Sequence, residues 1–253
     1  MIIERTILNP ITYEFPPDGG KVPIIDPYDG CQLCCPYCWQ LNDENWNKDI
    51  YVNINIADLI NEKLSSWDKS EIVYIGSRCD PYMQLEEEYG LTRKCLSVLN
   101  ELGINTMITT KSDNSLIFRD IDILRNFNAD ITVLMGISNV NQIEEGVQNN
   151  NILTANNLVG NGVPVWVFIT PVLPYIMDVE EIIDALNADI PIFLDKLRIE
   201  ADTIQADKLK KFIRQHYPEY IDQYNKVINE NDERYYDELT SKYASNSRIK
   251  ILF

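Results

Sequence analysis

The sequence predicts an α/β fold: a partial parallel barrel of the (β/α)6 type, followed by a helical C-terminal extension. Short apolar runs rich in β-branched residues alternate with segments whose apolar residues recur at helical spacing. Glycine ends two of these helical segments, at Gly103 and Gly160. Strands that alternate with helices pair in parallel through right-handed crossovers. In such folds the residues that carry the chemistry lie at the carboxyl ends of the strands.

The elements are expected in a regular order after an irregular segment over residues 1–20. Strands are predicted over 22–25, 71–76, 104–109, 131–136, 163–170, 192–199 and 249–253. Helices are predicted over 56–67, 92–102, 114–127, 152–159 and 179–186, with two or more polar helices over 204–244 that Pro218 interrupts. We therefore expect a barrel core over residues 1–200 and a mostly helical extension over 201–253, packed on the core.

Composition and charge limit the classes of partner. The chain has 253 residues, 45% of them hydrophobic, and a net charge of −17 from 39 acids and 22 bases. A polyanion would be repelled unless the bases gather in one groove, so the balance counts against nucleic acid without ruling it out. Residues 1–10 lack the apolar core of a signal peptide, and no run of 18 apolar residues is present. We expect a cytoplasmic protein with no membrane segment.

Four of the six cysteines fall within residues 31–38, immediately after the first predicted strand. Cys31, Cys35 and Cys38 form a Cys-x3-Cys-x2-Cys motif, and three thiolates can bind three irons of a 4Fe–4S cubane. The fourth iron would then be open to a small molecule, for which an amino acid with an amine and a carboxylate is the natural chelate. Cys34 is expected to pack behind the loop.

Two other interpretations of this loop stay open. Cys31, Cys34, Cys35 and Cys38 offer four thiols to a structural zinc ion, although adjacent cysteines do not easily bind one ion and zinc loops usually take a second pair from a distant hairpin. An electron-transfer cluster would need a fourth cysteine within reach.

The chain resembles the radical S-adenosylmethionine enzymes, in the branch related to spore photoproduct lyase. The resemblance covers about residues 22–200 and rests on four segments: DPYDGCQLCCPYCWQ, GSRCDPYMQLEEEYGLTRKCL, TTKSDNSLIFRDIDIL and GISN. It implies a partial barrel in which the open iron holds the methionyl amine and carboxylate of S-adenosylmethionine. It further implies reductive cleavage to methionine and a 5′-deoxyadenosyl radical, which abstracts hydrogen from a substrate.

The same resemblance suggests roles for five residues at the strand ends. Tyr37 would lie beside the adenine, and the loop at Gly76 and Ser77 would receive the methionyl amine through a backbone carbonyl. Lys111 would pair with the methionyl carboxylate, and Ser138 would contact the cofactor. Each role has a competing interpretation. Tyr37 could simply pack the loop, and Gly76 and Ser77 could form an ordinary strand-end turn. Lys111 could be a surface lysine, and Ser138 could be a helix N-cap.

Cys79 ends the second strand of the predicted barrel and is the candidate for returning a hydrogen atom to a product radical. The competing interpretation is an ordinary buried cysteine. Asp80, Tyr82 and Glu86 are candidates for substrate contact or a charged loop. Arg198 and Glu200 are candidates for the cavity mouth, and Arg119-Asp120 is expected on a solvated face.

Three functions are consistent with the sequence. The first is a radical S-adenosylmethionine enzyme that acts on a peptide or small molecule and takes electrons from a reductant such as flavodoxin or ferredoxin. Its reaction type, whether lyase, oxidoreductase or another modification, is not determined by the motif. The second is a DNA photolesion repair lyase, and the third is a non-catalytic iron–sulfur or zinc-binding module.

Overall fold

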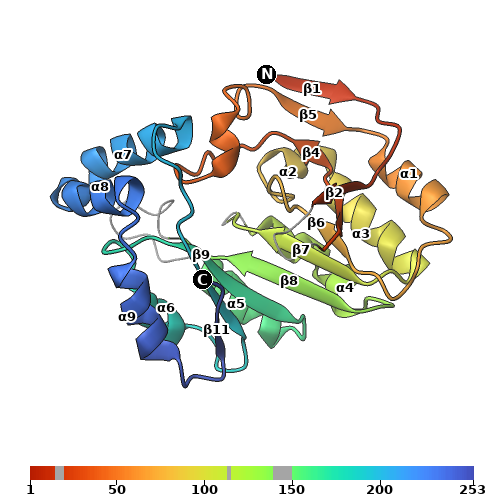
Figure 1. Ribbon diagram of the computed structural model, residues 1–253. Helices are drawn as coiled ribbons and strands as arrows, with labels where there is room; N and C mark the ends of the chain where they lie inside the picture. The colour runs from red at the N-terminus through yellow and green to blue at the C-terminus, as the bar shows by residue number, and fades with distance from the viewer. Residues whose placement is uncertain (15–19, 113–114, 139–149) are drawn as a thin grey trace.

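The main sheet of the computed structural model has eight strands in the order β11-β10-β9-β8-β7-β6-β3-β2 (Figure 1). The structure describes residues 1–14, 20–112, 115–138 and 150–253. Seven strands run parallel: β3 (Val22–Ile25), β6 (Val73–Ile75), β7 (Thr106–Thr110), β8 (Ile131–Gly136), β9 (Val165–Val172), β10 (Ile192–Lys196) and β11 (Ile249–Ile251). β2 (Thr12–Glu14) pairs antiparallel with β3 at one edge. In the described chain the sheet stays open between β2 and β11, which confirms the predicted partial barrel.

The parallel strands form from apolar runs that are buried on both faces. In β8, Ile131, Val133, Leu134 and Met135 are all buried, although their side chains alternate between the two sides of the sheet. This is the pattern of a strand covered by helices on one face and by core or loops on the other. The central strands are therefore a rigid base for the loops at their carboxyl ends.

Helical segments connect the strands of the described core from β5 (Ile50–Asn53) to β10. Their bounds are α1 (Ile56–Lys63), α2 (Leu85–Tyr89), α3 (Leu91–Leu102), a 3-10 segment (Leu116–Asp120), α4 (Ile121–Arg125), α5 (Asn150–Gly160) and α6 (Val179–Ala185). Figure 1 shows α1 and α3 side by side near β6 and β7, and the two helices are in contact. α3 buries Leu91, Cys95, Leu96 and Leu99, which share one helical face.

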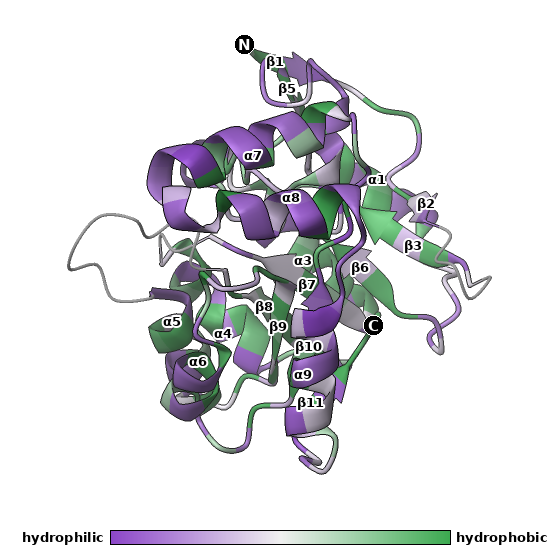
Figure 2. Cartoon of the chain, turned by 60° about the vertical axis from the view of Figure 1, so that its left-hand side comes forward, coloured by the Kyte–Doolittle hydropathy of each residue, from purple (hydrophilic) through white to green (hydrophobic). Residues whose placement is uncertain are grey.

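The C-terminal segment is helical and also adds one strand to the sheet. It contains α7 (Ile204–His216), a 3-10 turn (Pro218–Tyr220), α8 (Ile221–Asn229) and α9 (Arg234–Tyr243), followed by β11. Figure 2 shows largely hydrophilic outer surfaces on α7, α8 and α9. α7 packs against the 3-10 turn Trp39–Asn42 that follows the cysteine loop. Across the described chain, no helix combines the length and the apolar character required of a membrane span.

The expectation of an irregular segment over residues 1–20 is wrong at β1 (Ile2–Arg5) and at β2. β1 pairs in parallel with β5 (Ile50–Asn53), and β5 also pairs with β4 (Tyr28–Asp29) to form a small second sheet. These strands are two to four residues long, and β1 pairs with β5 across 48 residues of sequence, so no local pattern indicates them.

The single helix expected over residues 114–127 is also corrected. The structure has the 3-10 segment and then α4, five residues each. Residues 113–114, part of the TKSDN segment, lie outside the described residues, as do residues 15–19 of the expected N-terminal loop and Asn139 at the end of the GISN segment.

Candidate functional site

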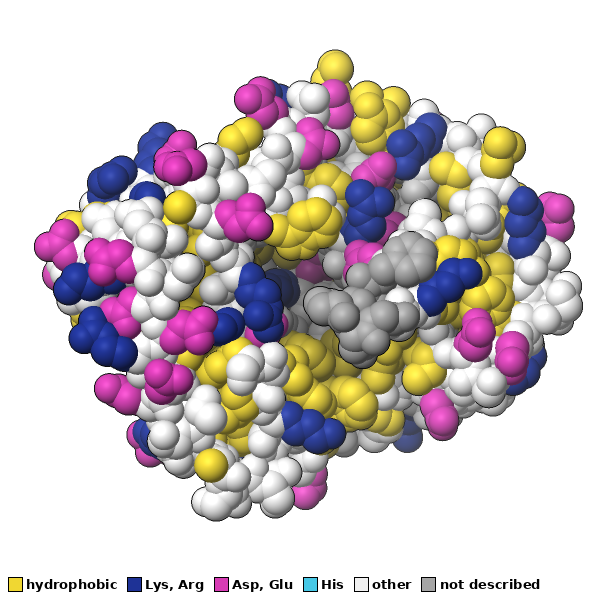
Figure 3. All heavy atoms as spheres, in the orientation of Figure 1, with side chains coloured by type: hydrophobic (Ala, Val, Ile, Leu, Met, Phe, Trp, Pro, Cys, Tyr) yellow, Lys and Arg dark blue, Asp and Glu magenta, His cyan; other side chains and the backbone are white. Residues whose placement is uncertain are grey.

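The carboxyl ends of the parallel strands surround a cavity of about 530 Å³. The cysteine loop follows β3, and the segment Gly76–Asp80 follows β6. Figure 3 shows a central hollow on this face, bordered by Lys and Arg side chains. Further lining residues come from the ends of β7, β9 and β10: Thr109, Thr110, Lys111, Thr170, Pro171, Asp195, Lys196, Leu197 and Arg198. The site therefore lies where the alternation of strands and helices predicts it.

Cys31, Cys35 and Cys38 all line this cavity and are free thiols. Burial raises the pKa of Cys31 to about 12 and the pKa of Cys38 above its usual value, and the neighbouring Cys35 adds to both. The raised pKa values favour the neutral thiols of Cys31 and Cys38, and metal ions would hold these two groups as thiolates. Cys34 is exposed, with a φ of 51°, and it also lines the cavity, so the expectation that it packs behind the loop is wrong.

The residues around the loop fit an iron–sulfur cluster better than a single ion. Among the residues that the structure describes, no three His, Cys, Asp or Glu side chains lie close enough together to hold one metal ion. In a cubane each thiolate binds a different iron, so the sulfurs are further apart than around one zinc. The buried Nε2 of Gln40, two residues after Cys38, has no hydrogen-bond partner among the described residues, and Gln40 lines the cavity. Cluster sulfurs accept such hydrogen bonds.

Tyr37 and Ser138 meet in space although they are 101 residues apart. Their hydroxyl oxygens are 2.6 Å apart, and both side chains are buried. Tyr37 lines the cavity between two cysteines, whereas Ser138 lies behind it, bonded to the phenol. Burial raises the pKa of Tyr37 well above its usual value, so the phenol is neutral. The pair presents the Tyr37 ring in a fixed orientation.

The Lys111 side chain crosses Gly136 to reach the cavity. A Cβ at position 136 would lie 2.4 Å from Cγ of Lys111. Only glycine at this position therefore avoids a steric clash with the lysine side chain. The Lys111 ammonium donates to the Thr170 carbonyl at 2.6 Å and to the Tyr37 hydroxyl at 3.3 Å, and it lies 4.8 Å from the centre of the Tyr37 ring. Burial lowers the pKa of Lys111, while negative charge on Cys35 and Cys38 would raise it.

Gly76 and Ser77 form the turn after β6 and line the cavity. Gly76 has a φ of +78°, and a Cβ there would lie 2.4 Å from Cδ of Pro81 and 2.7 Å from the Thr109 carbonyl. A side chain is therefore excluded at this position. Ser77 is exposed and donates to Oε2 of Glu14 in β2 at 3.0 Å.

Cys79 lines the cavity but is only 3% exposed. Its thiol donates to the Tyr28 carbonyl at 2.8 Å, and it packs with Tyr28, Trp46 and Met83. Burial raises the pKa of Cys79 well above its usual value, and nearby acids add to the effect. The thiol keeps its proton, and that proton points toward the Tyr28 carbonyl in this structure.

Asp80 joins the ends of β6 and β7. Its carboxylate accepts from the backbone N–H groups of Tyr82, Lys111 and Ser112 and from the hydroxyls of Thr110 and Ser112, at 2.5–3.1 Å. With its oxygens satisfied in this way, Asp80 positions Lys111 beside the cavity.

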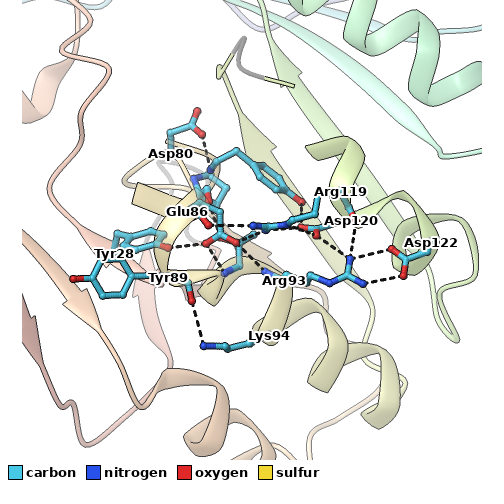
Figure 4. A network of polar contacts seen from close by, with 12 residues as sticks. Tyr28, Asp80, Glu86, Tyr89, Arg93, Lys94, Arg119, Asp120 and Asp122 are labelled. Carbon is cyan, nitrogen blue, oxygen red and sulfur yellow. Dashed lines mark hydrogen bonds and ion pairs between the residues drawn. The ribbon is translucent and has the colours of Figure 1, made fainter. Parts of the chain in front are cut away.

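The cavity wall does not include Tyr82, Glu86 or Asp120. The expectation that Tyr82 or Glu86 contacts substrate is therefore not supported. Tyr82 donates to Asp120 at 3.1 Å, and Glu86 accepts from Tyr28 at 2.6 Å (Figure 4). Arg119 pairs with both Glu86 and Asp120, whose side chains are fully buried. The expectation of a solvated Arg119-Asp120 face is therefore wrong.

Several lining residues were missed by the sequence reasoning. Gln205, at the start of α7, is buried and donates to the Tyr37 carbonyl at 2.6 Å, so the extension holds the cysteine loop. Gln40 and Lys196 also line the cavity, and no sequence signal indicated them. Arg78 lines it as part of the strand-end loop Gly76-Ser77-Arg78 that the sequence reasoning placed at the site. Of the two residues expected at the mouth, Arg198 is present and Glu200 is not a lining residue.

Comparison with known proteins identifies a relative in sequence and several solved structures that share this fold. No protein-family model matches the chain. The chain is 30% identical over 215 residues to the uncharacterized protein MJ0683 of Methanocaldococcus jannaschii, an alignment that covers 79% of this chain and 78% of that protein.

Solved structures with the same fold include enzymes bound to the expected cofactor. Spore photoproduct lyase complexed with dinucleoside spore photoproduct superposes with a TM-score of 0.61 at 15% identity, over 86% of this chain and 66% of that one. A variant of that lyase with bound AdoMet and the dinucleoside has a TM-score of 0.59 at 13% identity over the same shares of the two chains. Streptococcus suis SuiB bound to S-adenosylmethionine has a TM-score of 0.50 at 17% identity, over 79% of this chain and 47% of that one.

This chain thus spans about two thirds of the lyase's length, and the structural likeness confirms the predicted resemblance at the level of the fold. The chain belongs to the family of MJ0683, and its fold is that found in spore photoproduct lyase.

Proposed function

We propose that this chain is a radical S-adenosylmethionine enzyme whose 4Fe–4S cluster is held by Cys31, Cys35 and Cys38. The observation that carries the proposal is that all three thiols line one cavity at the strand ends of this fold. When bound, the cluster would supply the electron that cleaves S-adenosylmethionine to methionine and a 5′-deoxyadenosyl radical. That radical would take hydrogen from a peptide or small-molecule substrate.

The surrounding residues would bind and orient S-adenosylmethionine. Lys111 offers an ammonium for the methionyl carboxylate, exchanging its present bond to the Thr170 carbonyl for an ion pair. Gly76 and Ser77 offer a turn on the cavity wall for the methionyl amine. The Tyr37 ring, held by Ser138, offers an apolar face to the adenine.

Cys79 is proposed to return a hydrogen atom to the product radical. Its S–H bond would break, and the resulting thiyl radical would take an electron from the reductant, such as flavodoxin or ferredoxin, and a proton from water. The neutral thiol and its place on the cavity wall support this role. Since a thiol exchanges with solvent, wild-type enzyme in D2O should place deuterium in the product, and Cys79→Ala should not. Equal deuterium in both would remove Cys79 from the mechanism.

DNA photolesion repair is the second candidate, because the lyase that shares this fold binds a dinucleoside photoproduct. The net charge of −17 works against a duplex substrate. Binding to ultraviolet-irradiated duplex DNA at physiological salt distinguishes the two candidates. Lesion repair requires this binding, whereas a peptide or small-molecule enzyme should not show it.

The experiment that tests the proposal is anaerobic reconstitution with iron and sulfide. We expect about four irons and four sulfides per chain, a change in the electron paramagnetic resonance signal on adding S-adenosylmethionine, and 5′-deoxyadenosine on reduction.

Cys34 supplies a matched control within the same loop. Replacing Cys31, Cys35 or Cys38 with alanine should abolish the iron signal, whereas Cys34→Ala should keep it, because Cys34 is the exposed thiol outside the motif. One zinc per chain, or loss of the cluster in Cys34→Ala, would reject the proposal.

A further inference from the structure

Arg78 is an exposed cation on the cavity wall, in the loop between Gly76 and Cys79. Its guanidinium carbon lies 5.9 Å from the centre of the Trp46 ring, and Trp46 lines the same cavity. An arginine beside an aromatic ring is oriented by the contact while its N–H groups stay available. Arg78 is thus held at the wall without using its donors.

The other cations on this wall already have partners. Arg198 pairs with Asp195 at 2.6 Å, and Lys196 pairs with Glu233 at 2.5 Å. Lys111 donates to Thr170 and Tyr37. For Arg78, by contrast, no carboxylate within the described ranges lies at ion-pair distance.

Asp26 is an acid close enough for Arg78 to influence its charge. The cation lowers the pKa of Asp26, but burial has the larger effect and raises that pKa to about 7. Near neutral pH this carboxyl group therefore carries only part of a charge, so it compensates the charge of Arg78 only in part.

A free arginine at the site is notable in a chain with 39 acids and 22 bases. The negative field of the whole chain repels anions from most of the surface, so a local cation at a cavity selects where an anion can bind. A guanidinium recognises planar oxyanions through two parallel hydrogen bonds.

We propose that Arg78 binds a carboxylate or phosphate group of the substrate. The inference rests on the proposed function, since it assigns the substrate of that same cavity to the anionic class. Lys111 would serve the carboxylate of S-adenosylmethionine, and Arg78 a second anion on the molecule that loses hydrogen.

Calorimetric titration of the reconstituted protein with malonate and with inorganic phosphate tests this. We expect saturable binding of at least one anion, weakened by salt. Tighter binding of malonate would indicate a carboxylate on the substrate, and tighter binding of inorganic phosphate would indicate a phosphate group. Arg78→Gln should weaken binding by at least about tenfold, and Arg78→Lys should weaken it less, because the charge remains and the paired donors are lost.

Arg198→Gln is the matched control, since Arg198 lines the same cavity but is paired. Its affinity should stay within about threefold of wild type. Absence of saturable binding in the wild type, wild-type affinity in Arg78→Gln, or an equal loss in Arg198→Gln would each overturn the inference. Failure of the wild type to form 5′-deoxyadenosine would instead overturn the proposed function, and anion binding would be unaffected.

Discussion

Two polar regions of this molecule differ in whether their groups have partners. The Glu86 network consists of Tyr28, Glu86, Arg93, Arg119, Asp120 and Asp122 (Figure 4). Glu86 accepts from Tyr28, Arg119 and the backbone of Thr92, and Asp120 accepts from Arg93, Arg119 and Tyr82. Every carboxylate in it is paired, and its role is to join α2, α3 and α4.

The cavity has the opposite character. Among the described residues, Nε2 of Gln40 has no acceptor, and Arg78 has no carboxylate at ion-pair distance. A buried polar group without a partner costs free energy, so a fold retains it where a ligand completes it. The comparison teaches that the Glu86 network joins elements of the fold, whereas Gln40 and Arg78 at the cavity keep donors available for a ligand.

The largest effect is expected when the satisfied network is broken. Arg119→Met would leave Glu86 and Asp120 buried with fewer donors, and we expect the free energy of unfolding to fall by about 3–5 kcal/mol. Denaturant titration of the apoprotein under reducing conditions measures it. Arg125→Met is the control, because Arg125 is exposed on α4. A similar, small change in both variants would contradict a structural role for the network.

Asp26 gives a pH-dependent test. Burial raises its pKa from 3.8 to about 7, so the native state binds this proton more tightly than the unfolded chain does. Its contribution to stability is complete below pH 4 and is lost as the pH rises through 7.

Asp26→Asn should remove that loss. At pH 8 the variant should be more stable than wild type by about 2 kcal/mol, less than the full linkage value because the carboxyl group is partly solvated. At pH 4 the difference should vanish. A difference that does not vary with pH between 4 and 8 would show that Asp26 is charged in the native state throughout.

Gly136→Ala tests whether a missing side chain sets the position of Lys111. The new Cβ would lie 2.4 Å from Cγ of Lys111. We expect a stability cost of about 1–2 kcal/mol and weaker binding of S-adenosylmethionine in equilibrium dialysis. Gly160→Ala is the control, because nothing lies within 4 Å of a Cβ there. Unchanged affinity in Gly136→Ala would argue against the carboxylate role of Lys111.

The sequence allowed much of the fold and the centre of the site to be predicted, because both have local signals. Strand and helix periodicity predicted β6 to β11, and the cysteine spacing predicted one loop. β1 and β5 were missed, since short strands that pair across 48 residues leave no local pattern. The cofactor roles suggested for Tyr37 and Ser138 followed only from a family resemblance, and their mutual hydrogen bond was not predicted.

The charged residues were misinterpreted for a physical reason. Arg119 and Asp120 have the composition of a solvated helix face, and nothing in their spacing shows that Glu86 is buried against them. Gln205 was missed because no sequence pattern distinguishes a glutamine on the surface from a buried glutamine that bonds a distant loop. Side-chain partners across the fold, unlike periodicity, are fixed only by tertiary packing.

The smallest effect is expected at Gln40, and the contrast with Gln205 makes it informative. Both glutamines are buried on the cavity wall, but Gln205 donates to the Tyr37 carbonyl while Nε2 of Gln40 has no acceptor. Gln205→Leu should therefore destabilise the apoprotein by about 1–3 kcal/mol, because it leaves that carbonyl unpaired, and Gln40→Leu by less than about 0.5 kcal/mol. In the reconstituted protein the order should reverse for the reduction potential. Loss of a donor near the cluster should make the potential of Gln40→Leu more negative. A large stability loss in apo Gln40→Leu, with an unchanged potential, would mean that Gln40 has a protein partner and that its open donor does not indicate a ligand.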